Sequence, residues 1–251
     1  MIRIFITCLF ISSFFLNCNS LKAQRKKKEK IVPSFVYHRF GDKRYPSTNI
    51  SKIKFEAHLK FLQKEGYTGV TLSEALDYLK NRGPQKKLVC LTVDDGFQSF
   101  YDHAFPLLQQ YGFTATVFIN TSSTDGADYM DWEVLREIQA AGIELGNHSH
   151  SHDYFLNDSS EMRLEHFASD LLQAQSLMDS LLGKRPTVYA YPFGEFDDSL
   201  KSVVAQSGIQ AAAAQSSGIM HSGSDFYALP RFPMSDQYGH IGAFVEKIGM
   251  R

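Results

Sequence analysis

Three histidines stand at alternate positions in one short stretch, and their spacing suits metal binding. The sequence GNHSHSHDYF, residues 146–155, contains His148, His150 and His152. His148 and His152 have the separation that puts two imidazoles on one face of a helical turn and suits zinc. His148 and His150 would share one face of a strand. Two neutral imidazoles and one carboxylate leave a fourth position open, which is typical of catalytic zinc, whereas the alternative is a solvated histidine-rich loop.

A pair of adjacent carboxylates is the second feature that could do chemistry. Asp94 and Asp95 follow the apolar stretch LVCLTV, residues 88–93, and precede Gly96. Successive strand residues point to opposite sides, so the two carboxylates can lie in different environments. One can bind a cation while the other faces a reacting group. The alternative is a simple Asp-Asp-Gly turn.

The elements that must position these residues alternate between apolar strands and amphipathic helices. We expect strands at residues 34–38, 88–93, 114–120, 143–147, 187–192 and 209–214, and helices at residues 51–65, 73–81, 98–111, 132–141, 158–182 and 197–206. Continuous apolar strands separated by helices imply a parallel sheet covered on both faces. The pattern favours an α/β fold, a distorted or incomplete (β/α) barrel of about seven parallel strands, over an open doubly wound sheet.

In such a barrel the functional groups lie at the C-terminal ends of the strands. LVCLTV leads into Asp94, IELGN (143–147) leads into His148, and TVYAYP (187–192) leads into Phe193. We therefore expect these three places in the chain to meet at one rim.

Composition limits the class of protein. The chain has 251 residues, is 43% hydrophobic and carries a formal net charge of -1, which gives no reason to expect nucleic acid as a partner. We interpret the basic run at residues 25–28 as a solvated linker, or as a segment near anionic membrane lipid. Cys90 is the one cysteine in the expected folded part. It should be a small buried hydrophobe without a disulfide partner.

The N-terminus has the features of an export signal. Arg3 precedes an apolar segment, residues 4–16, that is too short to span a bilayer as a permanent helix. Cleavage after Ala23 would release a soluble protein, whereas cleavage before Cys18 would leave a lipid-anchored one. Either product leaves the cytoplasm for the cell envelope or the medium. We divide the chain into a signal peptide at 1–23 (or 1–17 with a lipidated Cys18), a basic linker at 24–33 and one folded domain at 34–251.

The aspartate and histidine motifs together resemble a known family. LTVDDGF (91–97) followed by GNHSHSH (146–152) is similar to the T-F-D-D-G and H-[S/T]-x-x-H motifs of the polysaccharide deacetylases. These are carbohydrate esterases with a NodB-homology domain. The resemblance spans roughly Ser34 to Phe232 and implies that 34–251 is a catalytic domain. It implies one divalent metal ion, zinc first with cobalt or nickel as alternatives, and as its ligands Asp95, His148 and His152.

The same resemblance implies roles for further residues. His150 falls on a variable position of the histidine motif. Asp94 matches the general base for hydrolysis of an acetyl group that the metal polarises. The backbone N–H of Phe193 matches a group that holds the oxyanion. The general acid stays open, with His221 and His240 as candidates.

Two departures from the family pattern matter. The third family motif is R-x-P-[Y/F], whereas this chain has Ala190-Tyr191-Pro192-Phe193, with alanine in place of arginine. We expect Arg231, in LPRF (229–232), to replace the missing arginine by pairing with Asp94, because a late barrel strand returns beside the early ones. DYMDW (128–132) looks like the family's D-x-x-D-W motif, but it precedes the histidine motif, so we assign it no role.

The stretches YHRF (37–40), AYPFGEFD (190–197) and ALPRF (228–232) resemble the exported branch of the family that deacetylates poly-β-1,6-N-acetylglucosamine. This implies an acetylated polysaccharide as substrate. Peptidoglycan, chitooligosaccharides and acetylxylan are alternatives. A non-catalytic carbohydrate-binding protein would fit the missing arginine and acid but not an intact Asp94. A barrel amidohydrolase would place its His-x-His pair near the start of the barrel.

Overall fold

A curled, mostly parallel sheet forms the centre of the computed structural model, which describes residues 29–249. Its strands are β1 (Ile31–Tyr37), β4 (Thr68–Val70), β5 (Leu88–Val93), β6 (Thr116–Ile119), β7 (Glu144–Asn147), β8 (Val188–Ala190), β9 (Ala211–Ala213), β10 (Ile219–His221) and β11 (Phe232–Pro233). The strand order is β10-β1-β5-β6-β7-β8-β9, with β11 also on β1 and β4 on β5. Only β10 runs antiparallel to its neighbour among these described pairs. The predicted incomplete α/β barrel is confirmed.

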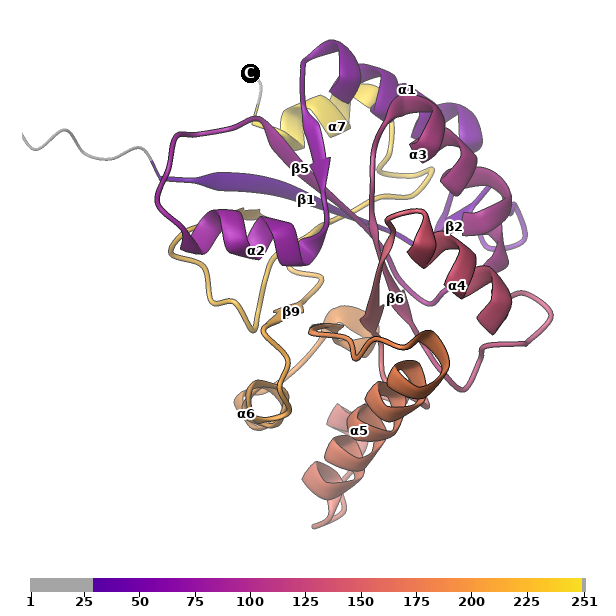
Figure 1. The fold of residues 1–251 in the computed structure, drawn as a ribbon, viewed down its shortest axis with the longest axis vertical. Helices are drawn as coiled ribbons and strands as arrows, with labels where there is room; N and C mark the ends of the chain where they lie inside the picture. Colours follow the sequence, from indigo (N-terminus) through magenta and orange to yellow (C-terminus); the bar gives the residue numbers. More distant parts are fainter. Residues whose placement is uncertain (1–28, 250–251) are drawn as a thin grey trace, which may run out of the picture.

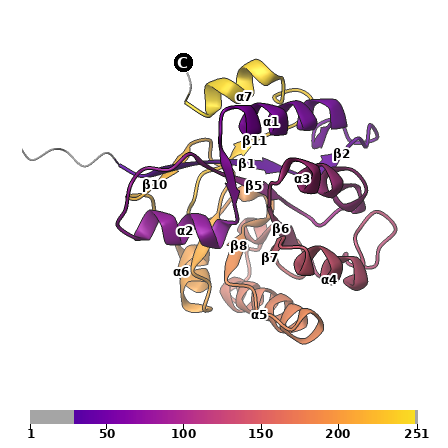
Figure 2. The ribbon, with the colours of Figure 1, turned by 45° about the horizontal axis from the view of Figure 1, so that its top comes forward.

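Helices surround the sheet (Figure 1) and bury one face each. They are α1 (Lys52–Lys64), α2 (Leu72–Lys80), α3 (Phe105–Tyr111), α4 (Trp132–Ala140), α5 (Arg163–Leu182), α6 (Asp198–Gln206) and α7 (Ile241–Lys247). The C-terminal α7 lies beside α1, as Figure 2 shows. In residues 29–249 we find no helix whose length and apolar character would let it cross a bilayer.

The sheet is closed by a segment near the C-terminus. Leu229 forms a parallel bridge to Ala213 of β9. Shortly afterwards, Phe232 pairs with Phe35 of β1. Residues 229–233 therefore join the last strand of the parallel series to the first, and Arg231 in the middle of this segment is fully buried.

The observed elements differ from the predicted ones mainly at their ends. The predicted helix at 98–111 contains a π-helical turn, Phe100–Ala104, before α3. Pro106 has no N–H to donate to the preceding turn, which accounts for this wider turn. The predicted start of the helix at 158–182 was wrong, because the Asp158 carboxylate accepts a hydrogen bond from the Ser160 N–H at 2.8 Å and holds a turn there.

Several short elements were not predicted, since two or three residues are too few to show a periodicity. They include β4, β10 and β11, and the separate two-stranded pair of β2 (Arg39–Phe40) and β3 (Asn49–Ile50). β1 begins at Ile31, within the segment expected to be a linker. The predicted signal segment, both cleavage points and Cys18 lie outside the described residues.

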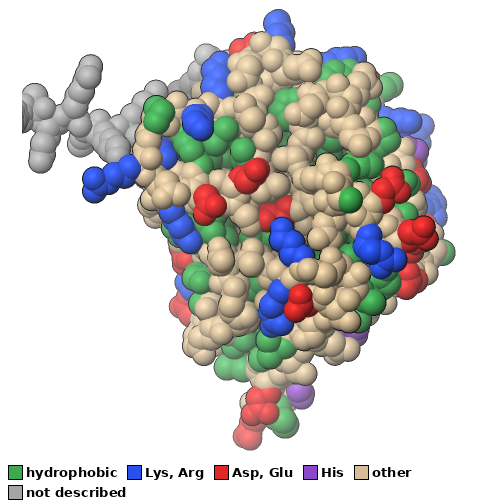
Figure 3. Space-filling model, viewed as in Figure 1, with side chains coloured by type: hydrophobic (Ala, Val, Ile, Leu, Met, Phe, Trp, Pro, Cys, Tyr) green, Lys and Arg blue, Asp and Glu red, His purple; other side chains and the backbone are tan. Residues whose placement is uncertain are grey.

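Charged side chains are mixed over the face of the molecule seen in Figure 3, where basic and acidic groups alternate without a patch of one sign.

Cys90 is buried in β5 and free. It packs in a cluster with Val32, Phe118 and Val188. The expectation of a small buried thiol is confirmed.

Gly146 of β7 provides a test of how tightly the sheet packs ahead of the histidine motif. A Cβ atom at this position would meet the Phe118 ring at 2.5 Å and Val188 Cγ2 at 3.0 Å. We expect Gly146→Ala to lower the free energy of unfolding by about 1–3 kcal/mol, measured by urea denaturation. Gly242→Ala is the control, because its Cβ would meet only His240 atoms, the nearer at 3.5 Å. It should leave stability unchanged or raise it by up to about 1 kcal/mol. Equal stabilities of the Gly146→Ala and parent proteins would contradict this packing.

Candidate metal centre and active site

The ends of several strands meet at one pocket of about 430 Å³. Its polar lining residues are His38, Asp94, Asp95, His148, His152 and Gln215, together with Ser47, Thr48, Ser235 and Tyr238. His38 follows β1, Asp94 follows β5 and His148 follows β7. The Asp94 N–H donates to the Tyr37 carbonyl at 2.9 Å, which continues the sheet pairing into the pocket. The rim expected from the sequence is present.

Asp95, His148 and His152 form a cluster that could hold a metal ion. One ligand atom from each lies within 4.8 Å of the other two. Asp95 Oδ1 is 3.3 Å from Nε2 of His148 and 3.3 Å from Nε2 of His152. His150 points elsewhere, with Nδ1 at 2.9 Å from the Thr121 hydroxyl and Nε2 against Gln173. The expected separation of His150 from the other two imidazoles is therefore observed.

The chemistry of this cluster fits a divalent ion. His148 Nδ1 lies 2.8 Å from the Ala190 carbonyl, so Nδ1 carries the proton and donates it. In the neutral ring the Nε2 lone pair then faces a carboxylate oxygen, and two acceptors at this distance require a cation or a proton between them. Burial would raise the pKa of Asp95, but its contacts with the His148 and His152 rings outweigh burial and lower this pKa. One carboxylate and two imidazoles are a zinc-type ligand set.

The loop that carries the histidines is not helical, so the helical spacing argument was wrong. Ser149 and His152 have φ angles of 70° and 59°. The chain turns back on itself after β7, and the Ser149 hydroxyl accepts a hydrogen bond from the His152 N–H at 2.8 Å. The Asp170 carboxylate accepts from the N–H groups of His150 and Ser151, both at 2.8 Å. Side-chain capping of a tight loop therefore brings the two ligands together.

Backbone strain is concentrated at the pocket. Positive φ angles outside glycine occur at five positions of the described chain, and four of them are Asp95, Ser149, His152 and Phe193. Such conformations cost about 1–3 kcal/mol each and persist only where the surroundings enforce them. Phe193 also keeps its ring half exposed, 4.8 Å from the His152 ring.

Arg231 enters the pocket floor from the segment that closes the sheet. Its guanidinium donates two hydrogen bonds to the Asp94 carboxylate, from Nη1 to Oδ1 at 2.7 Å and from Nη2 to Oδ2 at 2.8 Å. Nε donates to the Ala214 carbonyl at 2.9 Å and Nη1 to Thr92 Oγ1 at 3.1 Å. Burial alone would raise the pKa of Asp94, but Arg231 and then His148 outweigh burial and lower it. The pairing of Arg231 with Asp94 is confirmed.

The two candidates for the general acid do not reach this pocket. His221 pairs with Ile31 at the start of β1, the opposite end of that strand from the pocket, and contacts Glu29 at 2.7 Å. His240 caps α7, where its Nδ1 accepts from the Ala243 N–H at 3.2 Å. The structure corrects both assignments.

His38 is the titratable residue that the sequence analysis did not assign. It lines the pocket one residue after β1. Burial lowers the pKa of His38, and the Asp94 and Asp95 carboxylates offset this shift only in part. Its signal was the position of YHRF directly after an apolar strand, the same kind of position that identified Asp94 and His148.

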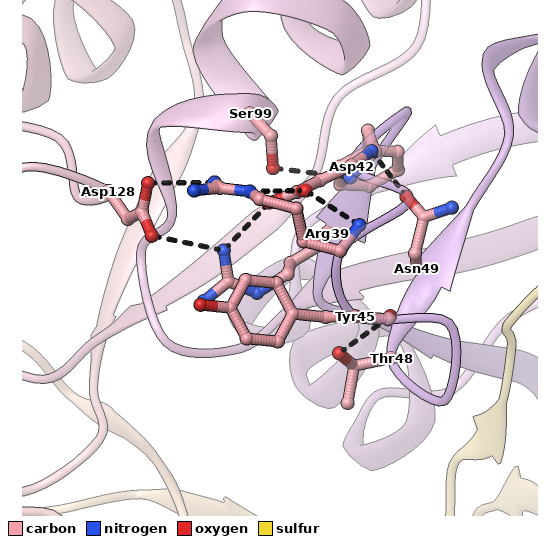
Figure 4. Close-up of polar contacts among 9 residues, drawn as sticks. Arg39, Asp42, Tyr45, Thr48, Asn49, Ser99 and Asp128 are labelled. Carbon is pink, nitrogen blue, oxygen red and sulfur yellow. Dashed lines mark hydrogen bonds and ion pairs between the residues drawn. The ribbon is translucent and has the colours of Figure 1, made fainter.

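The DYMDW stretch contributes structure beside the pocket. The Asp128 carboxylate accepts from Arg44 Nη2 at 2.8 Å, and this contact belongs to a network with Arg39 and Asp42 (Figure 4). The Asp131 carboxylate caps α4 by accepting from the Val134 N–H at 2.7 Å. Trp132 packs partly buried against the core. None of the three lines the pocket, in agreement with leaving this motif unassigned.

A curled parallel sheet with a carboxylate, two imidazoles and an arginine-paired aspartate at its C-terminal rim defines the class as a half-barrel hydrolase. The family profile described as polysaccharide deacetylase matches residues 81–212. The chain therefore belongs to the polysaccharide deacetylase family and is an enzyme of that kind. The amidohydrolase alternative is wrong.

Individual relatives agree with this assignment. The poly-β-1,6-N-acetyl-D-glucosamine N-deacetylase of Staphylococcus aureus is 25% identical over 86% of this chain and 78% of its own length. The structure of IcaB from Ammonifex degensii matches with a TM-score of 0.76 and 25% identity, over 88% of this chain and 97% of that one. The Streptococcus pyogenes deacetylase PplD, in complex with acetate, has the same fold, with a TM-score of 0.79 and 21% identity over 88% of this chain and 99% of that one.

The buried ion pair gives a test by substitution. Arg231→Met leaves the Asp94 carboxylate buried without a partner and should cost about 3–5 kcal/mol of unfolding free energy at neutral pH. The lowered pKa of Asp94 in the folded protein means that its ionisation contributes stability above about pH 4, which is lost as the pH falls through the folded pKa. Arg231→Met removes the strongest influence that lowers this pKa, so burial should raise it, and the difference in unfolding free energy between the two proteins should shrink in acid.

Urea denaturation at several pH values measures this difference. Lys60→Met, which removes an exposed partner of Glu56, is the control and should change stability by less than about 0.5 kcal/mol at every pH. If the difference in unfolding free energy between Arg231→Met and the parent stays constant with pH, this would contradict a role of Arg231 that depends on its charge.

Proposed function

We propose that this enzyme removes N-acetyl groups from poly-β-1,6-N-acetylglucosamine by metal-assisted hydrolysis. The observation that carries the choice of polymer is the similarity to the Staphylococcus aureus poly-β-1,6-N-acetyl-D-glucosamine N-deacetylase along 86% of the chain. The likeness to IcaB, at a TM-score of 0.76, supports the same choice. The enzyme would act outside the cytoplasm, as the export signal predicted from the sequence implies, and a lipid on Cys18 would hold it at a membrane.

We assign the metal ligands as Asp95, His148 and His152. Zinc suits this set, and cobalt or nickel would also accept it. When bound, the ion would supply Lewis-acid chemistry toward the acetamide carbonyl and the attacking water. The Ala190 carbonyl supports the site because it holds the His148 ring through Nδ1 and leaves Nε2 free to bind a metal ion beside Asp95.

Asp94 serves as the general base in this proposal. It lies next to Asp95 in the chain and lines the same pocket, so one carboxylate can bind the ion while the other accepts the proton of the attacking water. Arg231 acts through Asp94. Its two hydrogen bonds fix the orientation of the carboxylate and keep it ionised.

The remaining two steps fall to Phe193 and His38. The backbone N–H of Phe193 would stabilise the negative charge that develops on the acetyl oxygen, and the positive φ of 61° orients this stretch of backbone at the pocket. His38 would donate a proton to the departing sugar nitrogen as the C–N bond breaks. The half-buried His38 imidazole lines the pocket, and its lowered pKa means that its protonated form gives up the proton readily. The products are acetate and a free amine on the sugar.

Acetate release from three polymers in parallel tests the substrate. We expect the purified zinc-loaded enzyme to have a kcat/KM for poly-β-1,6-N-acetylglucosamine at least about tenfold above its values for chitooligosaccharides and acetylxylan, a difference of about 1.4 kcal/mol in transition-state binding. Faster release from either of the other two would transfer the assignment to that polymer. Binding of all three without acetate release would favour a non-catalytic carbohydrate-binding protein.

Four substitutions separate the roles of the pocket residues when metal content and turnover are both measured. His152→Ala should lose the metal and the activity, whereas His150→Ala should keep both. Asp94→Asn and His38→Gln should keep the metal but lower kcat by about 10²–10⁴-fold, as expected for loss of a base or an acid. Metal loss in His150→Ala with retention in His152→Ala would overturn the ligand assignment. Near-normal turnover in Asp94→Asn would overturn its role as base.

A further inference from the structure

Exposed aromatic side chains are few and gather at the pocket. In residues 29–249, the Phe, Tyr and Trp side chains classed as exposed are Tyr45, Phe193 and Tyr238, at 41%, 51% and 49%. Phe193 and Tyr238 line the pocket, and Tyr45 lies in the loop whose Ser47 and Thr48 line it. Single exposed apolar residues are normal anywhere on a surface, but their gathering around one cavity indicates a binding surface.

Two loops carry the tyrosines, and we name them together the tyrosine rim: residues 41–48 with Tyr45, and residues 234–239 with Tyr238. Asn49, directly after the first loop, links the two. Its Nδ2 donates to the Asp236 carboxylate at 3.0 Å, and its Oδ1 accepts from the Asp42 N–H at 2.7 Å. The two loops therefore form one continuous edge of the pocket.

Tyr238 is held by the packing of the residue that follows it. A Cβ atom on Gly239 would meet the Ser235 carbonyl oxygen at 2.6 Å and Ile50 Cδ1 at 2.8 Å, so the backbone here packs closely against these two residues. The Gly239 carbonyl also accepts a hydrogen bond from Nε2 of the buried His58 at 2.8 Å. The exposed Tyr238 ring therefore lies directly before a closely packed, hydrogen-bonded stretch of backbone.

Tyr45 is held by an arginine that is itself fixed on both sides. The Arg39 guanidinium lies 3.9 Å from the Tyr45 ring centroid and 3.4 Å from that of Phe97. Asp42 accepts from Arg39 at 3.1 Å and from Arg44 at 2.9 Å, and Asp128 joins this network from the other side (Figure 4). An aromatic ring stacked on a buried guanidinium loses little further entropy when a ligand binds.

The pocket volume and the polymer chemistry suggest what this edge contacts. At about 430 Å³, the cavity lies near the lower end of small-molecule sites, which span roughly 300–1,000 Å³, so a polymer must extend beyond its mouth, where the tyrosine rim forms one edge. In a β-linked N-acetylglucosamine chain the ring substituents are equatorial and each ring face presents axial C–H groups. Such a face packs well on an aromatic ring.

We propose that Tyr238 and Tyr45 bind the sugar units next to the reacting one, so that the enzyme prefers a chain over a single unit. This rests on the proposed function for the identity of the sugar. The tyrosine rim then affects the reaction by fixing where the polymer lies, and Tyr45 and Tyr238 are specificity-determining residues. Arg39, Asp42, Arg44 and Asp128 are positioning residues for Tyr45.

Chain-length dependence tests the proposal. In the parent protein, kcat/KM for acetate release should be higher for a β-1,6-linked N-acetylglucosamine pentasaccharide than for the monosaccharide N-acetylglucosamine. Tyr238→Ala and Tyr45→Ala should each lower kcat/KM for the pentasaccharide about tenfold, mainly through KM, with a much smaller loss for the monosaccharide. Tyr238→Phe and Tyr45→Phe should restore the pentasaccharide value, because the ring face makes the contact. Ile53→Ala, at a site on α1 that is 80% exposed, is the control and should change neither value.

A binding measurement tests the tyrosine rim in the absence of turnover. Calorimetric binding of the pentasaccharide to Asp94→Asn should weaken about tenfold when Tyr238→Ala is added. Equal losses for both chain lengths, no loss of pentasaccharide binding, or a Phe variant that behaves like the Ala variant would each overturn the proposal. If the parent instead deacetylates only another acetylated oligomer, the polymer assignment fails, and the same chain-length series on that oligomer still decides the role of the rim.

Discussion

The buried pair of Arg231 with Asp94 is the interaction on which the rest of the site depends. Two charges in the interior are tolerated only because each arm of the guanidinium meets an oxygen of the carboxylate and Nε reaches the Ala214 carbonyl. Arg231 can do this because residues 229–233 contact both β9 and β1. Closure of the sheet and orientation of Asp94 are therefore one structural event. A loss of the arginine would leave the carboxylate at the pocket floor unpaired.

The candidate metal ligands Asp95, His148 and His152 depend on strained loops at the C-terminal ends of the strands. Asp95 and His152 adopt positive φ angles, and Ser149 and Phe193 do so beside them. Hydrogen bonds from the loop to Asp170 and Ser149, and from His148 to Ala190, offset this cost. The two carboxylates of the Asp94-Asp95 pair thereby have different partners. Asp94 is directed at Arg231 and Asp95 at the imidazoles.

The floor and the mouth of the pocket differ in the kind of side chain that they present. Polar and charged groups gather at the floor, whereas exposed rings lie at the mouth. In the proposed reaction, the groups at the floor act on one acetylated unit. A polymer substrate offers further units, and rigidly supported aromatic rings at the edge are suited to contact them with little loss of entropy. If the tyrosine rim binds the polymer as proposed, changes in loops 41–48 and 234–239 would alter which polymer is bound without altering the fold.

The amino-acid sequence by itself determined the alternation of strands and helices, the incomplete α/β barrel, and the residues Asp94, Asp95, His148 and His152. These depend on local periodicity and on motif spacing, which are properties of neighbouring residues. The contact of Arg231 with Asp94 was also expected, because barrel closure brings a late segment beside an early strand. Only the tertiary structure decided that the histidine loop is a capped turn and not a helix. It also decided that His38 shares the pocket while His221 and His240 do not. Sheet register, and the end of the strand that each histidine follows, decide which of several histidines faces a pocket. Short strands such as β10 and β11 have too few residues for their register to be predicted from the sequence.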